Sequence, residues 1–97
     1  MFNIKMTPFA LKQYEEIKKQ EPRQGLLKQI KKTIKFLREN PRHPSLHTHK
    51  NQKLSNRLGL DIFQVYVQNY IPGAYRIFFI YSAKDEITIT SIESHPD

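Results

Sequence analysis

Five side chains in this 97-residue chain have the chemistry of a reactive site: one arginine and four histidines. Arg76 is the only arginine of residues 58–97 and begins the most apolar run of the chain. Its guanidinium could hold a phosphate group bidentately. The histidines are His43, His47, His49 and His95. An imidazole titrates near neutral pH and can donate or accept a proton, so these residue types suit anion binding beside an acid–base group.

Each of these residues also has a purely structural interpretation. Arg76 could form an ion pair within a sheet, with Asp61 or Glu93 as its partner. His95 lies two residues from the end of the sequence, where side chains often have no role. His47 and His49 flank a single residue, but no carboxylate is adjacent in the sequence, so we predict neither a metal site nor a cofactor.

The basic residues are concentrated in the first part of the chain. Residues 1–57 hold fourteen of the sixteen Lys and Arg residues and carry a net charge of +10, whereas residues 58–97 carry −3. A solvated lysine-rich helix would explain part of this pattern. The basic stretch of residues 42–57 adds to it, and a polarised basic half favours polyanions because each neutralised phosphate releases a counterion. Nucleic acid is therefore the favoured partner.

Several classes of protein are excluded or disfavoured by composition. The chain has no cysteine, which excludes disulfides, thiolate metal sites and a cysteine nucleophile. Its longest apolar run, residues 77–81, is far shorter than a membrane span. Residues 1–5 lack the pattern of a signal peptide. We expect a cytoplasmic protein that does not bind membranes.

The hydrophobic pattern predicts the elements that would position the reactive side chains. Alternation over residues 2–6 predicts a strand, and Thr7-Pro8 predicts the N-cap and first residue of a helix. Glu21-Pro22 separates this helix from a second one, which ends at Asn40-Pro41. The link between the two helices is so short that they are predicted to form an antiparallel hairpin. Residues 41–57 are expected to be a long polar connection that is functional or mobile.

The remainder of the sequence is typical of strands. Runs over residues 62–67, 74–81 and 87–92 are separated by turn residues at 71–73 and 84–85, which predicts an antiparallel meander. The expected fold is therefore a single α+β domain over residues 1–97. Its N-terminal strand leads into an antiparallel helical hairpin packed on a small, mostly antiparallel sheet that ends in a three-stranded meander.

Three short motifs carry a resemblance to a known family. They are Phe36-Leu37-Arg38-Glu39-Asn40-Pro41, which is like an L-x-x-N-P helix end, Ala74-Tyr75-Arg76-Ile77-Phe78-Phe79, which is like a Y-R-I-aromatic strand, and Ile92-Glu93-Ser94-His95, which is like an I-x-x-H close. With the order of elements, which matches over essentially the whole chain, they make the sequence similar to the RelE/ParE superfamily of toxins from toxin–antitoxin systems.

The resemblance implies one of two activities on one scaffold. RelE-like members cut messenger RNA in the ribosomal A site, whereas ParE-like members inhibit DNA gyrase and are not nucleases. We expect a ribosome-dependent, metal-independent mRNA endonuclease that inhibits translation, in which the 2′-OH of the RNA attacks the adjacent phosphate. The alternatives are a ParE-like gyrase inhibitor and a catalytically degenerate member that binds nucleic acid.

The resemblance also implies site residues. RelE-like nucleases use the arginine at the position of Arg76, and related members have a catalytic histidine or arginine at the position of His95. YafQ-like nucleases have a catalytic histidine just before the first central strand, where His49 is the nearest match. Lys50 and Lys53 could instead act as a base or as phosphate anchors, like the paired lysines of RelE. The expected RNA-binding residues are Lys50, Lys53, Arg57, Lys32 and Lys35.

The sequence departs from the family pattern at two places. Many RelE-like members continue past the histidine to a Tyr or Phe, whereas this sequence ends with His95-Pro96-Asp97. Tyr75-Arg76 stands where the YafQ pattern has an aspartate–tryptophan pair. The partners implied are the ribosome, its message and a cognate acidic antitoxin, whose amphipathic segment would fold as it binds the basic cleft.

Overall fold

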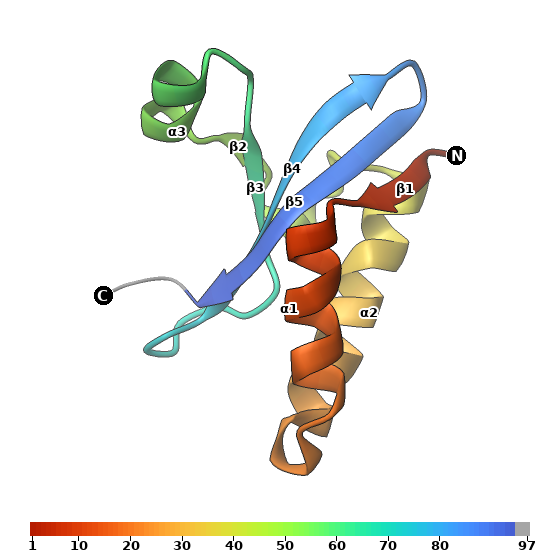
Figure 1. The fold of residues 1–97 in the computed structure, drawn as a ribbon, viewed down its shortest axis with the longest axis vertical. Coiled ribbons are helices and arrows are strands. Elements are labelled where there is room, and N and C mark those ends of the chain that lie inside the picture. The colour runs from red at the N-terminus through yellow and green to blue at the C-terminus, as the bar shows by residue number, and fades with distance from the viewer. Residues whose placement is uncertain (95–97) are drawn as a thin grey trace.

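A computed structural model describes residues 1–94 of the chain, apart from the side chain of Glu21. Its sheet consists of β1 (Asn3–Met6), β2 (His49–Lys50), β3 (Phe63–Tyr66), β4 (Tyr75–Ala83) and β5 (Glu86–Ser94). The strand order is β1-β5-β4-β3-β2 (Figure 1), with β1 parallel to β5 and all other neighbours antiparallel. The mostly antiparallel sheet and its C-terminal meander are thus confirmed, and β4 is the central strand.

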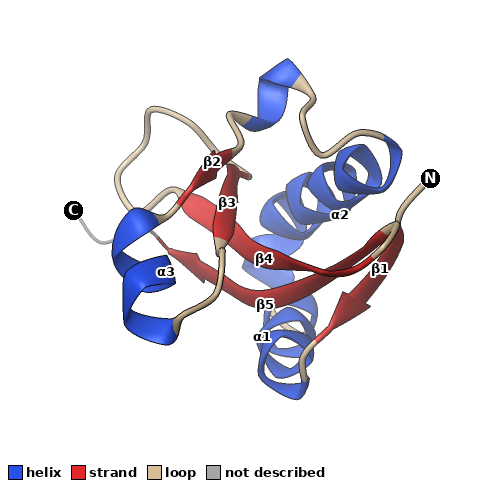
Figure 2. Ribbon diagram, turned by 90° about the horizontal axis from the view of Figure 1, so that it is seen from above, coloured by secondary structure: helices blue, strands red, loops and turns tan. Residues whose placement is uncertain are grey.

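The helical hairpin is also confirmed. Helix α1 (Pro8–Lys18) is followed by the 3₁₀ turn η1 (Glu21–Arg23) and by α2 (Gln24–Glu39). Thr7 caps α1, since its side chain accepts a hydrogen bond from the Ala10 N–H at 3.1 Å, and α2 ends before Asn40. The two helices run side by side on one side of the sheet (Figure 2). Within the described residues, no helix is both long and apolar enough to cross a membrane.

The core lies between the hairpin and the sheet. Its fully buried side chains include Ala10, Ile30, Leu37, Val65, Ile77, Phe79, Ile87 and Ile89. A β-bulge explains how β5 buries both Ile89 and Ile92, which are three positions apart. The register jumps from Phe78 opposite Ser91 to Phe79 opposite Ile89, so one extra residue resets the alternation of side chains.

The segment expected to be a long polar connection is largely structured, so the prediction that it holds no helix or strand was wrong. It contains the 3₁₀ turn η2 (Pro44–Leu46), strand β2 and helix α3 (Gln52–Leu58). Asn51 caps α3 by accepting from the Leu54 N–H at 3.0 Å, and Gly59 ends it in the left-handed conformation. The cap residues were visible in the sequence, but a seven-residue helix has too few apolar positions to show a helical period.

Candidate functional site

The pairing of the central strands places Arg76 on the face of the sheet opposite the helical hairpin. Val65, Ile77 and Ile92 form one cross-strand row and are buried in the core. Side chains alternate between faces along a strand, so the neighbouring row faces away from the hairpin. That row consists of Tyr66, Arg76 and Glu93.

The guanidinium of Arg76 is fixed without a carboxylate. Its Nη1 donates hydrogen bonds to the carbonyl oxygens of Gln68 and Tyr75 at 3.0 and 3.2 Å, and its Cζ lies 3.7 Å from the centre of the Tyr66 ring. The residue is only 9% exposed, and its buried Nε has no hydrogen-bond partner within residues 1–94. An unsatisfied buried donor costs about 1–3 kcal/mol. An anion bound at the Arg76 guanidinium would accept a hydrogen bond from this Nε–H.

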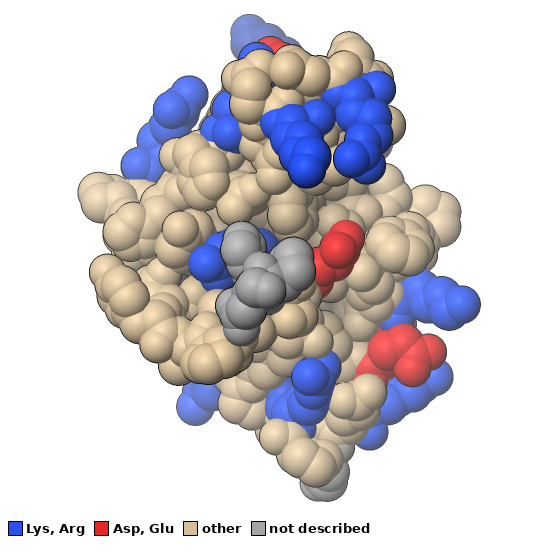
Figure 3. Space-filling view, turned by 90° about the vertical axis from the view of Figure 1, so that its left-hand side faces the viewer, with Lys and Arg blue, Asp and Glu red and all other residues tan. Residues whose placement is uncertain are grey.

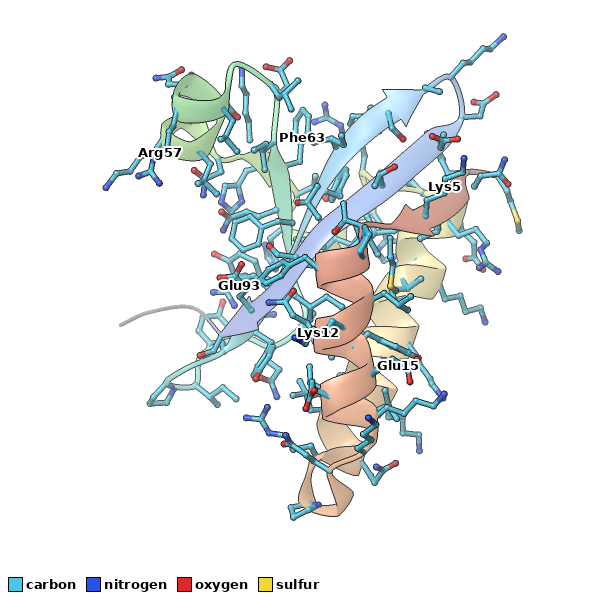
Figure 4. The ribbon with its side chains drawn as sticks, viewed as in Figure 1. Lys5, Lys12, Glu15, Arg57, Phe63 and Glu93 are labelled. Atoms are coloured by element: carbon cyan, nitrogen blue, oxygen red, sulfur yellow. The ribbon has the colours of Figure 1, made fainter. Side chains whose placement is uncertain are left out.

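The ion pairs considered for Arg76 are not formed. Asp61 pairs with Lys50, Nζ to Oδ1 at 2.9 Å. Glu93 is the cross-strand neighbour of Arg76 on β5, yet no ion pair joins the two side chains. In Figure 4 Glu93 lies on the C-terminal half of β5. The positive charge of Arg76 is therefore not neutralised by any carboxylate of residues 1–94.

His47 and His49, the first residue of β2, contact the same tyrosine as Arg76. The rings of His47 and His49 lie 5.1 and 6.1 Å from the Tyr66 ring, centre to centre. The Nδ1 of His49 is 2.9 Å from the carbonyl oxygen of His47, and because a carbonyl only accepts, Nδ1 carries the proton. The neutral ring then has its lone pair on Nε2, where it can act as a base. His49 is exposed, so a ligand can reach it.

The third histidine of the segment lies apart from this group. His43 stacks on Phe36 at 4.5 Å, and its Nδ1 accepts from the Ser45 N–H at 3.2 Å, so it caps η2. The remaining predicted catalytic residue, His95, lies outside the described residues. Residues 1–94 contain no group of three His, Asp or Glu side chains placed as metal ligands would be.

The predicted RNA-binding residues form two separate groups. Lys53 and Arg57 are exposed on α3, which lies at the β2–β3 end of the sheet, and Arg57 extends away from the body of the protein (Figure 4). Figure 3 shows Lys and Arg side chains over this end of the molecule. Lys32 and Lys35 are exposed on α2 and belong to a different surface. Lys50 is partly occupied by its ion pair with Asp61.

Two residues that shape the site were not among those predicted for it. Tyr66 supplies the ring that Arg76, His47 and His49 share, and Gln68 supplies the carbonyl that holds Nη1 of Arg76. Tyr66 was visible only as one aromatic in a strand, a place where aromatics are usually core. The role of Gln68 comes from its backbone, so no side-chain signal could have indicated it.

Comparison with known proteins gives the fold. No family model and no curated protein sequence matches the chain. Among solved structures, the YoeB dimer from Staphylococcus aureus matches with a TM-score of 0.70 and 17% identity, over 97% of both chains. The heterotetrameric complex of YoeB-YefM toxin-antitoxin from the same organism matches with a TM-score of 0.70 and 19% identity, over 98% of both chains. The chain therefore has the fold of the YoeB toxin, an α+β fold with a mixed five-stranded sheet, as its resemblance to the RelE/ParE toxins implied.

Proposed function

We propose that this chain is the toxin of a type II toxin–antitoxin system and that it cuts messenger RNA on the ribosome, in the cytoplasm. The observation that carries the proposal is Arg76: a guanidinium that is fixed by two carbonyl oxygens and an aromatic ring and is not paired with a carboxylate within residues 1–94. A pre-positioned cation of this kind is what the charge of a phosphorane transition state requires. The likeness to YoeB in fold and the motifs of the RelE/ParE superfamily support the assignment.

In this proposal the RNA supplies its own nucleophile. The 2′-OH attacks the adjacent phosphorus, the bond to the 5′-oxygen breaks, and a 2′,3′-cyclic phosphate and a 5′-OH result. Nε2 of His49 takes the proton of the 2′-OH, Arg76 stabilises the phosphorane, and His95 is the proposed acid that protonates the 5′-oxygen. No metal or cofactor takes part in these steps.

The proposed partner that silences the toxin is an acidic antitoxin. The chain carries a net charge of +7, and a segment of opposite charge would neutralise its basic surface as it folded there. YoeB, the structural neighbour, occurs in a complex with YefM, a toxin-antitoxin pair. The ribosome and its message are the proposed targets.

The test is cleavage of a defined message on translating ribosomes, mapped by primer extension, with antitoxin-free protein. We expect cuts at A-site codons for the wild type and a loss of roughly 10²–10³-fold in rate for Arg76→Ala, the size seen when a charge-stabilising donor is removed. Circular dichroism checks that the variant is folded. No cuts by folded protein that still arrests growth would contradict the proposal and favour a gyrase inhibitor.

A further inference from the structure

A groove lies between α2 and the end of β3, beside the Arg76 site. Two adjoining hollows of about 630 and about 160 Å³ open along it, and both are lined by Gln29 and Lys32. The smaller hollow also reaches Tyr66. Arg76 extends from the other face of the sheet, and the groove adjoins it at the end of β3, where Tyr66 contacts the guanidinium and the Gln68 carbonyl accepts from Nη1.

The lining of the groove suits a single-stranded nucleic acid. Lys28 and Lys32 are four positions apart on α2 and therefore lie on the same side of the helix, and no Asp or Glu lines either hollow. The Gln68 amide already bonds to Oε1 of Gln29 and to the Tyr75 N–H, so the Gln29 side-chain N–H groups and the Asn69 amide are the groups that can bond to base edges. Unpaired bases are commonly recognised by such hydrogen bonds, while cations track the phosphates.

One hydrogen-bonded residue joins the groove to Arg76. The side chain of Gln68, two residues after β3, donates to Oε1 of Gln29 on α2 at 2.9 Å and so ties the segment after β3 to the helix. The backbone carbonyl of the same Gln68 accepts from Nη1 of Arg76 at 3.0 Å. A strand that lay along the groove would thus contact the residue that holds the arginine.

We propose that this groove binds the single-stranded RNA that flanks the phosphodiester held by Arg76. The inference rests on the proposed function for the identity of the substrate, and it adds a binding subsite with its own residues. Lys28 and Lys32 hold the phosphates of the strand, while Gln29 and Asn69 contact its bases. An acidic protein segment is the competing occupant, and the amide groups along the groove and its opening at Arg76 favour RNA.

Gly25 offers a matched pair of variants that test the groove. It borders the larger hollow, and a Cβ built there meets no heavy atom within 4 Å. Gly25→Gln and Gly25→Glu place side chains of nearly the same size at the edge of the groove and differ by one negative charge. Both replace a poor helix former, and a carboxylate near the N-terminus of α2 favours the helix, so both should fold.

The probe is a fluorescein-labelled RNA 12-mer in which every ribose is 2′-O-methylated, so that it cannot be cleaved by its own 2′-OH. We expect its Kd, measured by fluorescence anisotropy, to be roughly fivefold to tenfold higher for Gly25→Glu than for Gly25→Gln. In a salt series, Lys32→Ala should lower the slope of log K against log salt by about 1, as loss of a phosphate contact does.

The outcomes separate the groove from the proposed reaction. Equal Kd values for the two Gly25 variants, or no binding by the wild type at low salt, would overturn the proposal that the groove binds RNA. So would a Gly25→Glu variant that captured an acidic partner less well but bound RNA unchanged. A charge-dependent difference in Kd without ribosomal cleavage would support RNA binding in the groove and contradict the proposed nuclease activity. Cleavage that needs Arg76 but is equal in both Gly25 variants would support the nuclease activity and contradict RNA binding in the groove.

Discussion

At the scale of single residues, Arg76 depends on Tyr66 for its orientation. The guanidinium carbon is 3.7 Å from the centre of the ring, close enough for a cation–π interaction, and the ring also contacts His47 and His49. We therefore expect Tyr66 to position Arg76 and the proposed base His49. Its hydroxyl is not needed for either contact.

Two replacements of Tyr66 should distinguish the contribution of its ring to cleavage from that of its hydroxyl. Tyr66→Phe keeps the aromatic face, and we expect its single-turnover cleavage rate on programmed ribosomes to stay within about threefold of the wild type. Tyr66→Leu removes the face, and a cation–π contact worth about 1–2 kcal/mol predicts a loss of roughly tenfold. The Kd for ribosomes should be unchanged in both. Equal rates for the Phe and Leu variants would contradict a positioning role of the ring.

The sequence could predict the chemistry of the site better than its geometry. Arg76 was expected from its residue type and motif, and its place in the central strand is confirmed, while its catalytic role stays a prediction. That Tyr66 faces Arg76 depends on the register of β3 against β4, which is set by the intervening residues 67–74. The length and composition of that segment do not determine the register.

At the scale of elements, α3 is the part of the fold that the sequence pattern missed. It is attached to the sheet by Ser55, which is 5% exposed and whose Oγ accepts from the Ile62 N–H at 2.8 Å, just before β3. The same hydroxyl lies 3.3 Å from the Ile62 carbonyl, to which it donates. This pair of bonds is made by a small polar residue and not by an apolar one, and such contacts leave no hydrophobic period in the sequence.

Ser55→Ala should therefore destabilise the protein. It leaves the buried N–H of Ile62 without an acceptor, which costs about 1–3 kcal/mol of unfolding free energy, measured by urea denaturation. Asn56→Ala is the matched control, because the Asn56 side chain bonds only to exposed Gln52, and its effect should stay within about 0.5 kcal/mol. If the two variants are equally stable, the Ser55 hydroxyl does not fasten α3 to the sheet.

The hairpin and the meander were predictable because their signals are local. Thr7-Pro8 and Asn40-Pro41 mark helix ends through the backbone chemistry of caps and prolines. The two-residue turn at 84–85 joins β4 to β5, with Asp85 in the left-handed conformation. The bulge opposite Phe78 and Phe79 was not predictable, because it is a property of two paired strands and not of either alone.

At the scale of the whole molecule, the predicted RNA-binding residues are divided between two surfaces. Lys53 and Arg57 stand on α3, and Lys32 and Lys35 stand on α2, so a polyanion could contact the protein from both sides of β3 and β2. The sequence indicated the excess of positive charge, but only as one basic stretch, residues 1–57. Where the cations lie is decided by the fold, and it determines which of them can contact RNA at the same time as Arg76.

Salt dependence can show which group contacts ribosomal RNA. We expect each double variant, Lys53→Ala with Arg57→Ala and Lys32→Ala with Lys35→Ala, to lower the slope of log K against log salt by about 1.4–1.8 in ribosome-pelleting assays, because each lost phosphate contact contributes about 0.7–0.9. The double variant Lys12→Ala with Lys18→Ala is the control, since it removes the same charge from α1, a helix that carries neither group. A control slope that falls as far as the others would mean that net charge alone, and not its placement by α2 and α3, governs binding. A fall confined to one of the two surfaces would identify the face that the protein turns toward the ribosome, and the opposite face would then be free for the antitoxin.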